Sequence, residues 1–146
     1  MDLAAQSSEG PAFAIHPQLA RDTFPVGDLP LSRVLLMNDA NFPWAIAVPR
    51  RPGAVEIFDL AAADRAQLMT EITSLGALLK ELTGCDKINT AAIGNMVPQL
   101  HVHVVARSRT DPAWPRPVWG ALPPRAYEAA AREHLLAALR ERIVES

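Results

Sequence analysis

Two of the four histidines in this chain, His101 and His103, stand two residues apart in an apolar, β-branched stretch. Successive side chains of a β-strand point to opposite faces, so both rings are predicted on one face, about 6.5–7 Å apart along the strand. Two imidazoles at that spacing can contact adjacent atoms of one small anion such as phosphate. Gln99 shares this face, whereas Val102 and Val104 point to the other face, toward a core.

Two other interpretations of the histidine pair remain open. An antiparallel sheet commonly has one wet face, so the rings can be surface residues without a ligand. Two histidines on one strand can also bind zinc, although a catalytic zinc site needs a third protein ligand. His16 and His134 have no recognisable ligand spacing, and the sequence identifies no carboxylate for that role. We therefore expect neither a metal nor another cofactor.

The elements that must position these side chains follow from hydrophobic patterns. Short segments rich in branched apolar residues predict extended structure at 33–37, 44–48, 54–58, 87–95 and 99–107. The turn-like residues after the first segment predict that it pairs with the second in antiparallel fashion. Apolar positions stepping by three and four residues between Asp59 and Gly84, the expected caps, predict one long amphipathic helix. With a further helix over about 124–143, this order predicts an α+β domain with a mostly antiparallel sheet.

Length, charge and cysteine content restrict the class of protein. A chain of 146 residues with 49% hydrophobic residues suits one domain, expected over 1–146 with an N-terminal extension of about 1–30. The formal net charge of −2 and the absence of a long Lys/Arg run argue against polymeric nucleic acid or a membrane as partner. The sequence contains neither a signal-peptide pattern nor a membrane span, and its single cysteine fits a cytoplasmic location.

The longer motif around the histidines resembles a known family. "QLHVHVV" (99–105), preceded by "GNMVP" (94–98), is similar to the active-site strand of the histidine triad (HIT) superfamily of nucleotidyl hydrolases and transferases. The family pattern is His-φ-His-φ-His-φ-φ, where φ is apolar. "NTAAIGN" (89–95) resembles the family's Asn-containing strand and turn, and "MNDANFPWAIAVPRRP" (37–52) resembles its early hairpin. The resemblance implies a HIT-like fold.

It also implies a reaction in which a histidine attacks the α-phosphorus of a nucleotide and water then hydrolyses the nucleotidyl-histidine intermediate. His101 matches the middle triad position and is the expected nucleophile, because a neutral imidazole is nucleophilic near pH 7. Its other ring nitrogen should then donate a hydrogen bond, for example to a backbone carbonyl. His103 matches the last position and would hydrogen-bond phosphate oxygens, whose charge favours the protonated ring.

Gln99 occupies the position of the family's first triad histidine. An amide can hold His101 or a phosphate oxygen, but it cannot carry a proton at neutral pH. The resemblance is therefore to a branch with glutamine at this position, similar to diadenosine tetraphosphate (Ap4A) hydrolase-like HIT proteins. We count Gln99 with His101 and His103 as a candidate catalytic residue.

The resemblance also implies which polar side chains contact the nucleotide. Asn38, followed by Asp39, matches the place where relatives present an Asn or Asp to the ribose hydroxyls. Asn89 resembles a phosphate-side asparagine, and Asn95 corresponds to a glutamine that contacts phosphate. Asn38, Asp39 and Asn95 are also common turn residues, so a purely local role stays open.

Apolar and aromatic side chains are the candidates for the remaining walls of a site. Leu36, Phe42 and Ile46 can flank a base, although such residues are more often core. Residues 107–120 combine three arginines with two tryptophans, which can approach a polyphosphate or anchor the segment. We favour anchoring to the body or to a second subunit, because relatives are often homodimers.

The expected function is cleavage of a substituted nucleoside 5′-phosphate, by hydrolysis or nucleotidyl transfer. Dinucleoside polyphosphates and nucleoside phosphoramidates are the expected substrate classes. The alternative is a nucleotide-binding module with little turnover, because Gln99 and Met96 replace groups that relatives use around the phosphate.

Overall fold

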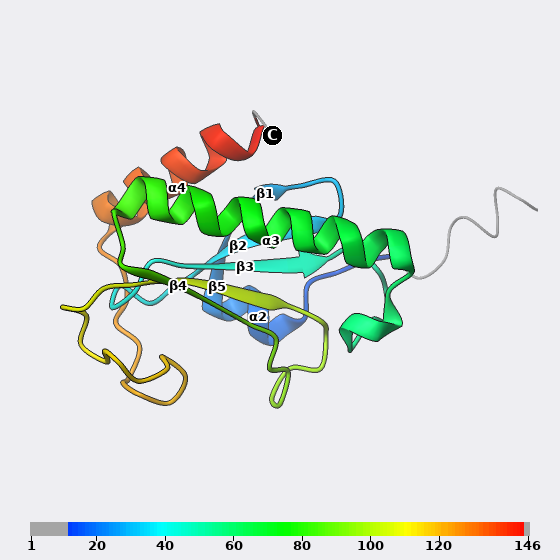
Figure 1. The fold of residues 1–146 in the computed structure, drawn as a ribbon, viewed down its shortest axis with the longest axis horizontal. Helices are drawn as coiled ribbons and strands as arrows, with labels where there is room; N and C mark the ends of the chain where they lie inside the picture. Colours follow the sequence, from blue (N-terminus) through cyan, green and yellow to red (C-terminus); the bar gives the residue numbers. More distant parts are fainter. Residues whose placement is uncertain (1–11, 145–146) are drawn as a thin grey trace, which may run out of the picture.

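A computed structural model describes residues 12–144, which form a five-stranded antiparallel sheet with helices on both faces (Figure 1). The elements in chain order are α2 (Pro17–Asp22), β1 (Thr23–Asp28), β2 (Ser32–Met37), β3 (Trp44–Pro49), the 3-10 turn η1 (Ile57–Asp59), α3 (Ala62–Thr83), β4 (Lys87–Ala91), β5 (Val102–Arg107) and α4 (Ala129–Val144). The strand order β1-β2-β3-β5-β4 places the histidine-bearing strand inside the sheet. The predicted α+β fold with its antiparallel sheet, long helix and C-terminal helix is confirmed.

Both faces of the sheet are covered. α3 and α4 lie on one side, where they bury a cluster that includes Leu36 and Val104. On the other side, α2 and the segment after β5 bury a second cluster that includes Ile46 and Val105 (Figure 1). All six residues of β3 and of β5 are buried, and apart from His103 and the terminal Arg107 their side chains are apolar.

The long helix forms where the apolar stripe predicts it. Leu68, Leu75 and Leu79 are buried on its inner face. The helix ends at Gly84, which adopts a left-handed conformation with φ of 65°, a geometry that glycine accommodates without a Cβ clash. Asp59 does not cap this helix, because its carboxylate accepts the backbone N–H groups of Val55 and Glu56 ahead of η1.

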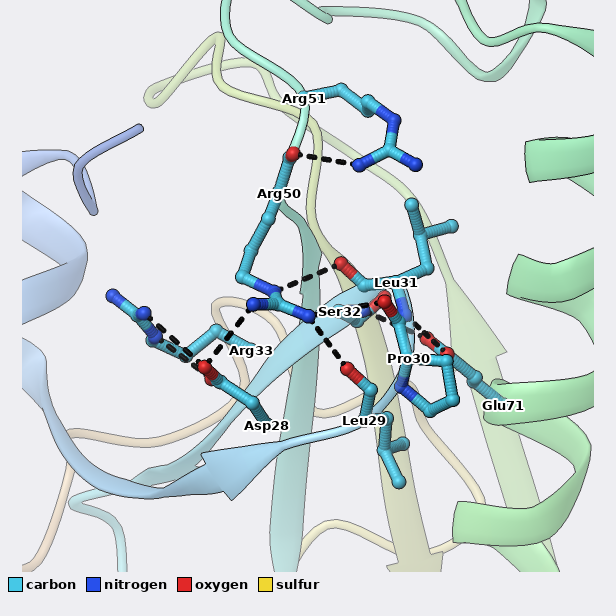
Figure 2. A network of polar contacts seen from close by, with 9 residues as sticks. All are labelled: Asp28, Leu29, Pro30, Leu31, Ser32, Arg33, Arg50, Arg51 and Glu71. Carbon is cyan, nitrogen blue, oxygen red and sulfur yellow. Dashed lines mark hydrogen bonds and ion pairs between the residues drawn. The ribbon is translucent and has the colours of Figure 1, made fainter. Parts of the chain in front are cut away.

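A buried polar network ties α3 to the turn between β1 and β2 (Figure 2). The carboxylate of Glu71 accepts the backbone N–H groups of Leu31 and Ser32, at 2.7 and 2.9 Å. The guanidinium of Arg50 donates to the carbonyl oxygens of residues 29–31. Because Glu71 on the helix satisfies two buried backbone N–H groups at the start of β2, the network fixes the helix relative to the sheet.

Several expected boundaries differ from the structure. Residues 54–58 form a loop leading into η1 rather than a strand, and the last helix begins at Ala129 rather than near residue 124. α2 and β1 were not predicted; they lie within the segment expected as an N-terminal extension, and β1 pairs with β2. Residues 1–11 of that segment lie outside the described residues. Between residues 12 and 144, no helix combines the length and apolar character needed to cross a membrane.

Candidate active site at the histidine pair

β5 begins at Val102, so His101 precedes the strand that was predicted over 99–107, but its side chain lines the same cavity as that of His103. Their ring centroids are 4.9 Å apart. Both residues are buried, with exposed fractions of 6% for His101 and 5% for His103, and both line a cavity of about 540 Å³. The interpretation as solvent-facing surface residues is therefore wrong. Among residues 12–144, no three His, Cys, Asp or Glu side chains are grouped in a way that could hold a metal ion.

The hydrogen bonds of the two rings place their protons differently. Nδ1 of His101 lies 2.7 Å from the backbone carbonyl oxygen of Gln99, which can only accept, so Nδ1 carries the proton and Nε2 keeps its lone pair. The indole N–H of Trp44 donates to Nδ1 of His103 over 3.0 Å, so the proton of that ring is on Nε2. One ring thus offers a lone pair at the cavity, and the other offers an N–H donor.

His103 is a neutral ring in this structure. Burial away from water, together with a smaller effect of the neighbouring His101 ring, lowers the pKa of His103 to about 4. The Trp44 N–H also favours the neutral ring, because a protonated Nδ1 could not accept that hydrogen bond. Burial and the Trp44 donor thus favour a neutral His103, whereas the expected protonated ring depends on the charge of a bound phosphate and stays a prediction.

We expect the ring of His103 to remain neutral from about pH 8 down to about pH 5, because its pKa lies below that window. Nitrogen-15 NMR of the imidazole should show the Nε2–H tautomer throughout this range. In the Trp44→Phe variant, the loss of the indole donor should raise the pKa. A wild-type titration midpoint near the ordinary value of 6.5 would contradict this assignment.

The turn before β5 forms one wall of the cavity. Gly94, Asn95 and Met96 line it, and Gly94 has a positive φ of 70°. Within the described residues, the backbone N–H groups of Asn95 and Met96 take part in no hydrogen bond. Consecutive free N–H groups in a turn provide donors for an anion without a charged side chain.

A second cavity, of about 480 Å³, adjoins the first. Both are lined by Asp22, Met37 and Trp119, so these three side chains stand between them. Asn38 and Asp39 lie on the wall of the second cavity. Together the two spaces have the size range of small-ligand sites.

Asn38 and Asp39 also join the end of β2 to the segment before α4. Oδ1 of Asn38 accepts the backbone N–H of Tyr127 at 3.1 Å, and Oδ1 of Asp39 accepts that of Arg125 at 3.3 Å. Asp39 is buried, and its carboxylate contributes with burial, the larger cause, to raising the pKa of Tyr127 to about 12. The Nδ2 group of Asn38 has no partner among residues 12–144, so it remains a donor for a ligand.

Two of the predicted site residues direct their side chains to other partners. The carboxamide of Gln99 contacts the backbone of Ala14 and His16, and Gln99 is not among the residues that line the larger cavity. Oδ1 of Asn89 accepts a hydrogen bond of 2.9 Å from the guanidinium of Arg107. The structure thus brings His101, His103 and Asn95 together and places Gln99 and Asn89 beside them.

The segment after β5 is anchored through Arg107. Its guanidinium is buried, donates to Asp111 at 2.8 and 3.2 Å, and lies over the rings of Phe42 and Trp114. Arg107 and Trp114 thus anchor this segment to the body of the domain. Trp119 is different: its ring centroid is 5.4 Å from that of His103, and its buried indole N–H has no hydrogen-bond partner within the described part of the chain.

Sequence analysis missed most of the cavity wall. Of the three apolar residues proposed to flank a base, Leu36 is buried under the helices, while Phe42 and Ile46 belong to the core on the other face. Alternation along β2 could have indicated Met37, which follows Leu36 and points to the opposite side. The tryptophans of residues 107–120 were candidates for a wall, but no local pattern distinguished Trp119 from Trp114 or indicated the contribution of α2.

Comparisons with known proteins identify a family and similar structures. The family model described as the HIT domain matches residues 18–110. A histidine triad protein from Bradyrhizobium japonicum is 56% identical, with 91% of this chain and 99% of that chain covered and a TM-score of 0.89. Histidine triad proteins from Marinobacter aquaeolei VT8 (44% identity, 92% and 98% covered, TM-score 0.89) and Sinorhizobium meliloti 1021 (43%, 88% and 96%, 0.86) are also similar. A comparison with curated protein sequences found no match.

Proposed function

The chain belongs to the histidine triad (HIT) family, and on that premise we propose that it cleaves substituted nucleoside 5′-phosphates through a nucleotidyl-histidine intermediate. The observation that carries the proposal is the opposite placement of protons on two adjacent rings. His101 has a lone pair on Nε2, His103 has a hydrogen there, and both line one cavity. A nucleophile next to a hydrogen-bond donor is the arrangement that displacement at phosphorus requires.

In the proposed first step, Nε2 of His101 attacks the α-phosphorus. A phosphorus–nitrogen bond forms, the bond to the leaving group breaks, and the leaving group departs with that electron pair. His103 donates its Nε2–H to a phosphoryl oxygen without transferring the proton. The Nδ1–H of His101 stays on the carbonyl of Gln99, which disperses the positive charge that develops on the ring. Water then attacks phosphorus and forms a phosphorus–oxygen bond, the phosphorus–nitrogen bond breaks with its electron pair returning to Nε2 of His101, the proton of the water passes to solvent, and the nucleoside monophosphate is released.

The two cavities suggest where the parts of the substrate bind. The phosphate fits the first cavity, where the free N–H groups of Asn95 and Met96 supply neutral donors. The nucleoside fits the second cavity, where Asn38 can donate to a ribose hydroxyl and Trp119 offers an aromatic surface. The roles of Asn38, Asp39, Asn89 and Asn95 in nucleotide binding remain proposals, as do a homodimeric assembly and a cytoplasmic location.

The lack of a side chain that can donate a proton near pH 7 favours one class of leaving group. A polyphosphate departs as a stable anion, whereas an amine must receive a proton as its bond to phosphorus breaks. Gln99 cannot supply that proton, and the neutral His103 can donate a hydrogen bond but does not act as an acid near pH 7. We therefore expect dinucleoside polyphosphates to be cleaved faster than nucleoside phosphoramidates.

A substrate panel tests this expectation. Release of nucleoside monophosphate is measured for diadenosine polyphosphates and for adenosine phosphoramidates with amines of graded basicity. The expected result is that kcat/KM for the polyphosphates exceeds that for the simple alkyl phosphoramidates by about 10²-fold, the usual contribution of general acid catalysis. Equal values for the two classes would show that a proton donor acts in the site. Rapid acid and alkaline quenching of labelled substrate checks for the nucleotidyl-histidine, whose phosphorus–nitrogen bond survives alkali and breaks in acid.

A nucleotide-binding module with little turnover is the second candidate. The carboxamide of Gln99 is engaged elsewhere, and Met96, which is 92% exposed, brings no polar group to the phosphate. Calorimetry with AMP beside the turnover assay separates the two functions. Tight binding with no product from any substrate of the panel would favour the module.

A further inference from the structure

The carboxamide of Gln99 uses both of its ends on the N-terminal segment. Its Oε1 accepts the backbone N–H of His16 at 2.8 Å, and its Nε2 donates to the backbone carbonyl of Ala14 at 2.8 Å. These two backbone groups are two residues apart, and the amide joins them as the N–H and C=O of one residue in a parallel neighbouring strand would. The contact spans 83 residues of sequence.

His16 continues this connection into α2. Its Nδ1 accepts the backbone N–H of Gln18 at 3.1 Å, which caps the first turn of the helix. Leu19 is buried against the sheet, and Gln18, Leu19 and Asp22 line the cavity that holds the two histidine rings. The position of one cavity wall therefore depends on where residues 14–16 are held.

The backbone of Gln99 contacts His101, which lines another part of the same cavity. The carbonyl of Gln99 accepts from Nδ1 of His101 at 2.7 Å and so sets the tautomer of that ring. Any residue at position 99 can provide this carbonyl, because it belongs to the main chain. The side chain at position 99 is thus available for a separate task.

We propose that Gln99 is a positioning residue that latches residues 14–16, and through them α2, against the nucleotide cavity. Its effect on the reaction rests on the proposed function, whereas its effect on the segment does not. Within that function, Gln99 contributes through its backbone to His101 and through its side chain to the cavity wall. A histidine here could not replace the amide, because its two ring nitrogens diverge and cannot meet both backbone groups in the same way.

The Gln99→Glu and Gln99→Ala variants test this latch. Alanine removes both hydrogen bonds. Glutamate at neutral pH keeps the acceptor for the His16 N–H, but its second carboxylate oxygen faces the carbonyl oxygen of Ala14, so that hydrogen bond is lost and the two oxygens repel each other. A carboxylic acid is isosteric with the amide, and its O–H can donate to that carbonyl. Acidification should therefore restore the latch in Gln99→Glu and leave Gln99→Ala unchanged.

Hydrogen exchange at pH 7 is measured for the amides of residues 14–22, with the buried amides of α3 as an internal control. Because a hydrogen bond contributes modestly to stability, we expect exchange of the 14–22 segment to be at least ~10-fold faster in both variants, with α3 unchanged. In Gln99→Glu the protection relative to wild type at the same pH should return as the pH falls from about 7 to about 4, through the reference carboxyl pKa of about 4.3. Protection of residues 14–22 that is equal in wild type and Gln99→Ala would overturn the proposal.

AMP affinity and turnover give the second measurement. The expected result is a several-fold higher KM and AMP Kd in both variants with kcat nearly retained, and a Gln99→Glu to wild-type Kd ratio that falls toward one as the pH is lowered to about 4. A fall in kcat with unchanged KM and Kd would place the Gln99 side chain in the chemistry and overturn a positioning role. If wild type neither binds nor cleaves any nucleotide, the proposed function fails, while the exchange measurement still decides whether the latch exists.

Discussion

Replacing His101 with alanine is expected to lower kcat for nucleoside monophosphate release by about 10⁴-fold or more, because the variant loses its nucleophile. No second ring can take over. Nδ1 of His103 is occupied by the Trp44 N–H, and its Nε2 carries hydrogen. In His101→Gly, added imidazole should restore part of the rate by occupying the vacated space.

Steady-state turnover of the best polyphosphate substrate measures this effect, with thermal unfolding as a check of folding. His134 lies exposed on α4, so His134→Ala is the matched control and should keep the wild-type rate. A His101→Ala rate within tenfold of wild type would remove this residue from the chemistry. Loss of the alkali-stable intermediate in His101→Ala alone would further identify it as the attacking group.

Replacing Asp111 with alanine is expected to lower the free energy of unfolding by about 3–5 kcal/mol, the usual loss when one partner of a buried ion pair is removed. Arg107 is only 1% exposed, so its guanidinium would be left buried without its carboxylate. Asp111 also accepts the backbone N–H groups of Ser108, Ala113 and Trp114. The variant should therefore also loosen the segment that carries Trp119 to the cavity.

The pH dependence of this contribution follows from the same contacts. Burial alone would raise the pKa of Asp111, but Arg107 and the backbone donors outweigh it and lower that pKa below its ordinary value of 3.8. The stabilisation is therefore complete above that ordinary value and is lost as the pH falls through the lower folded-state pKa. At neutral pH the full effect of Asp111→Ala should be measurable.

Urea unfolding followed by circular dichroism measures the loss. Asp28→Ala is the control, because Asp28 forms comparable ion pairs with Arg33 and Arg50 at the surface, where the side chains are about a third exposed. Such exposed pairs contribute about 0–1 kcal/mol. A loss for Asp111→Ala no greater than for Asp28→Ala would contradict the structural role assigned to the buried pair.

The sequence was sufficient wherever short-range periodicity controls structure. The alternation around β5 correctly predicted that His101 and His103 share a face and that Val102 and Val104 face the helices. The stripe that ends at Gly84 correctly predicted α3. These features depend on φ and ψ preferences and on the burial of side chains a few residues apart, so a linear pattern contains them.

The protonation of the site was decided by tertiary contacts. The tautomer of His103 depends on Trp44, 59 residues away, and the lowered pKa of its ring depends first on burial. The side chain of Gln99 meets a segment 83 residues earlier, and Trp119 reaches His103 from a loop anchored by Arg107. Spacing along the chain does not encode such partners, because packing selects them only after the strands and helices have come together. The sequence by itself determined which side chains could act and which face they share. The tertiary structure decided the tautomers of the two rings, the residues that line the cavity and the hydrogen-bond partners of each side chain.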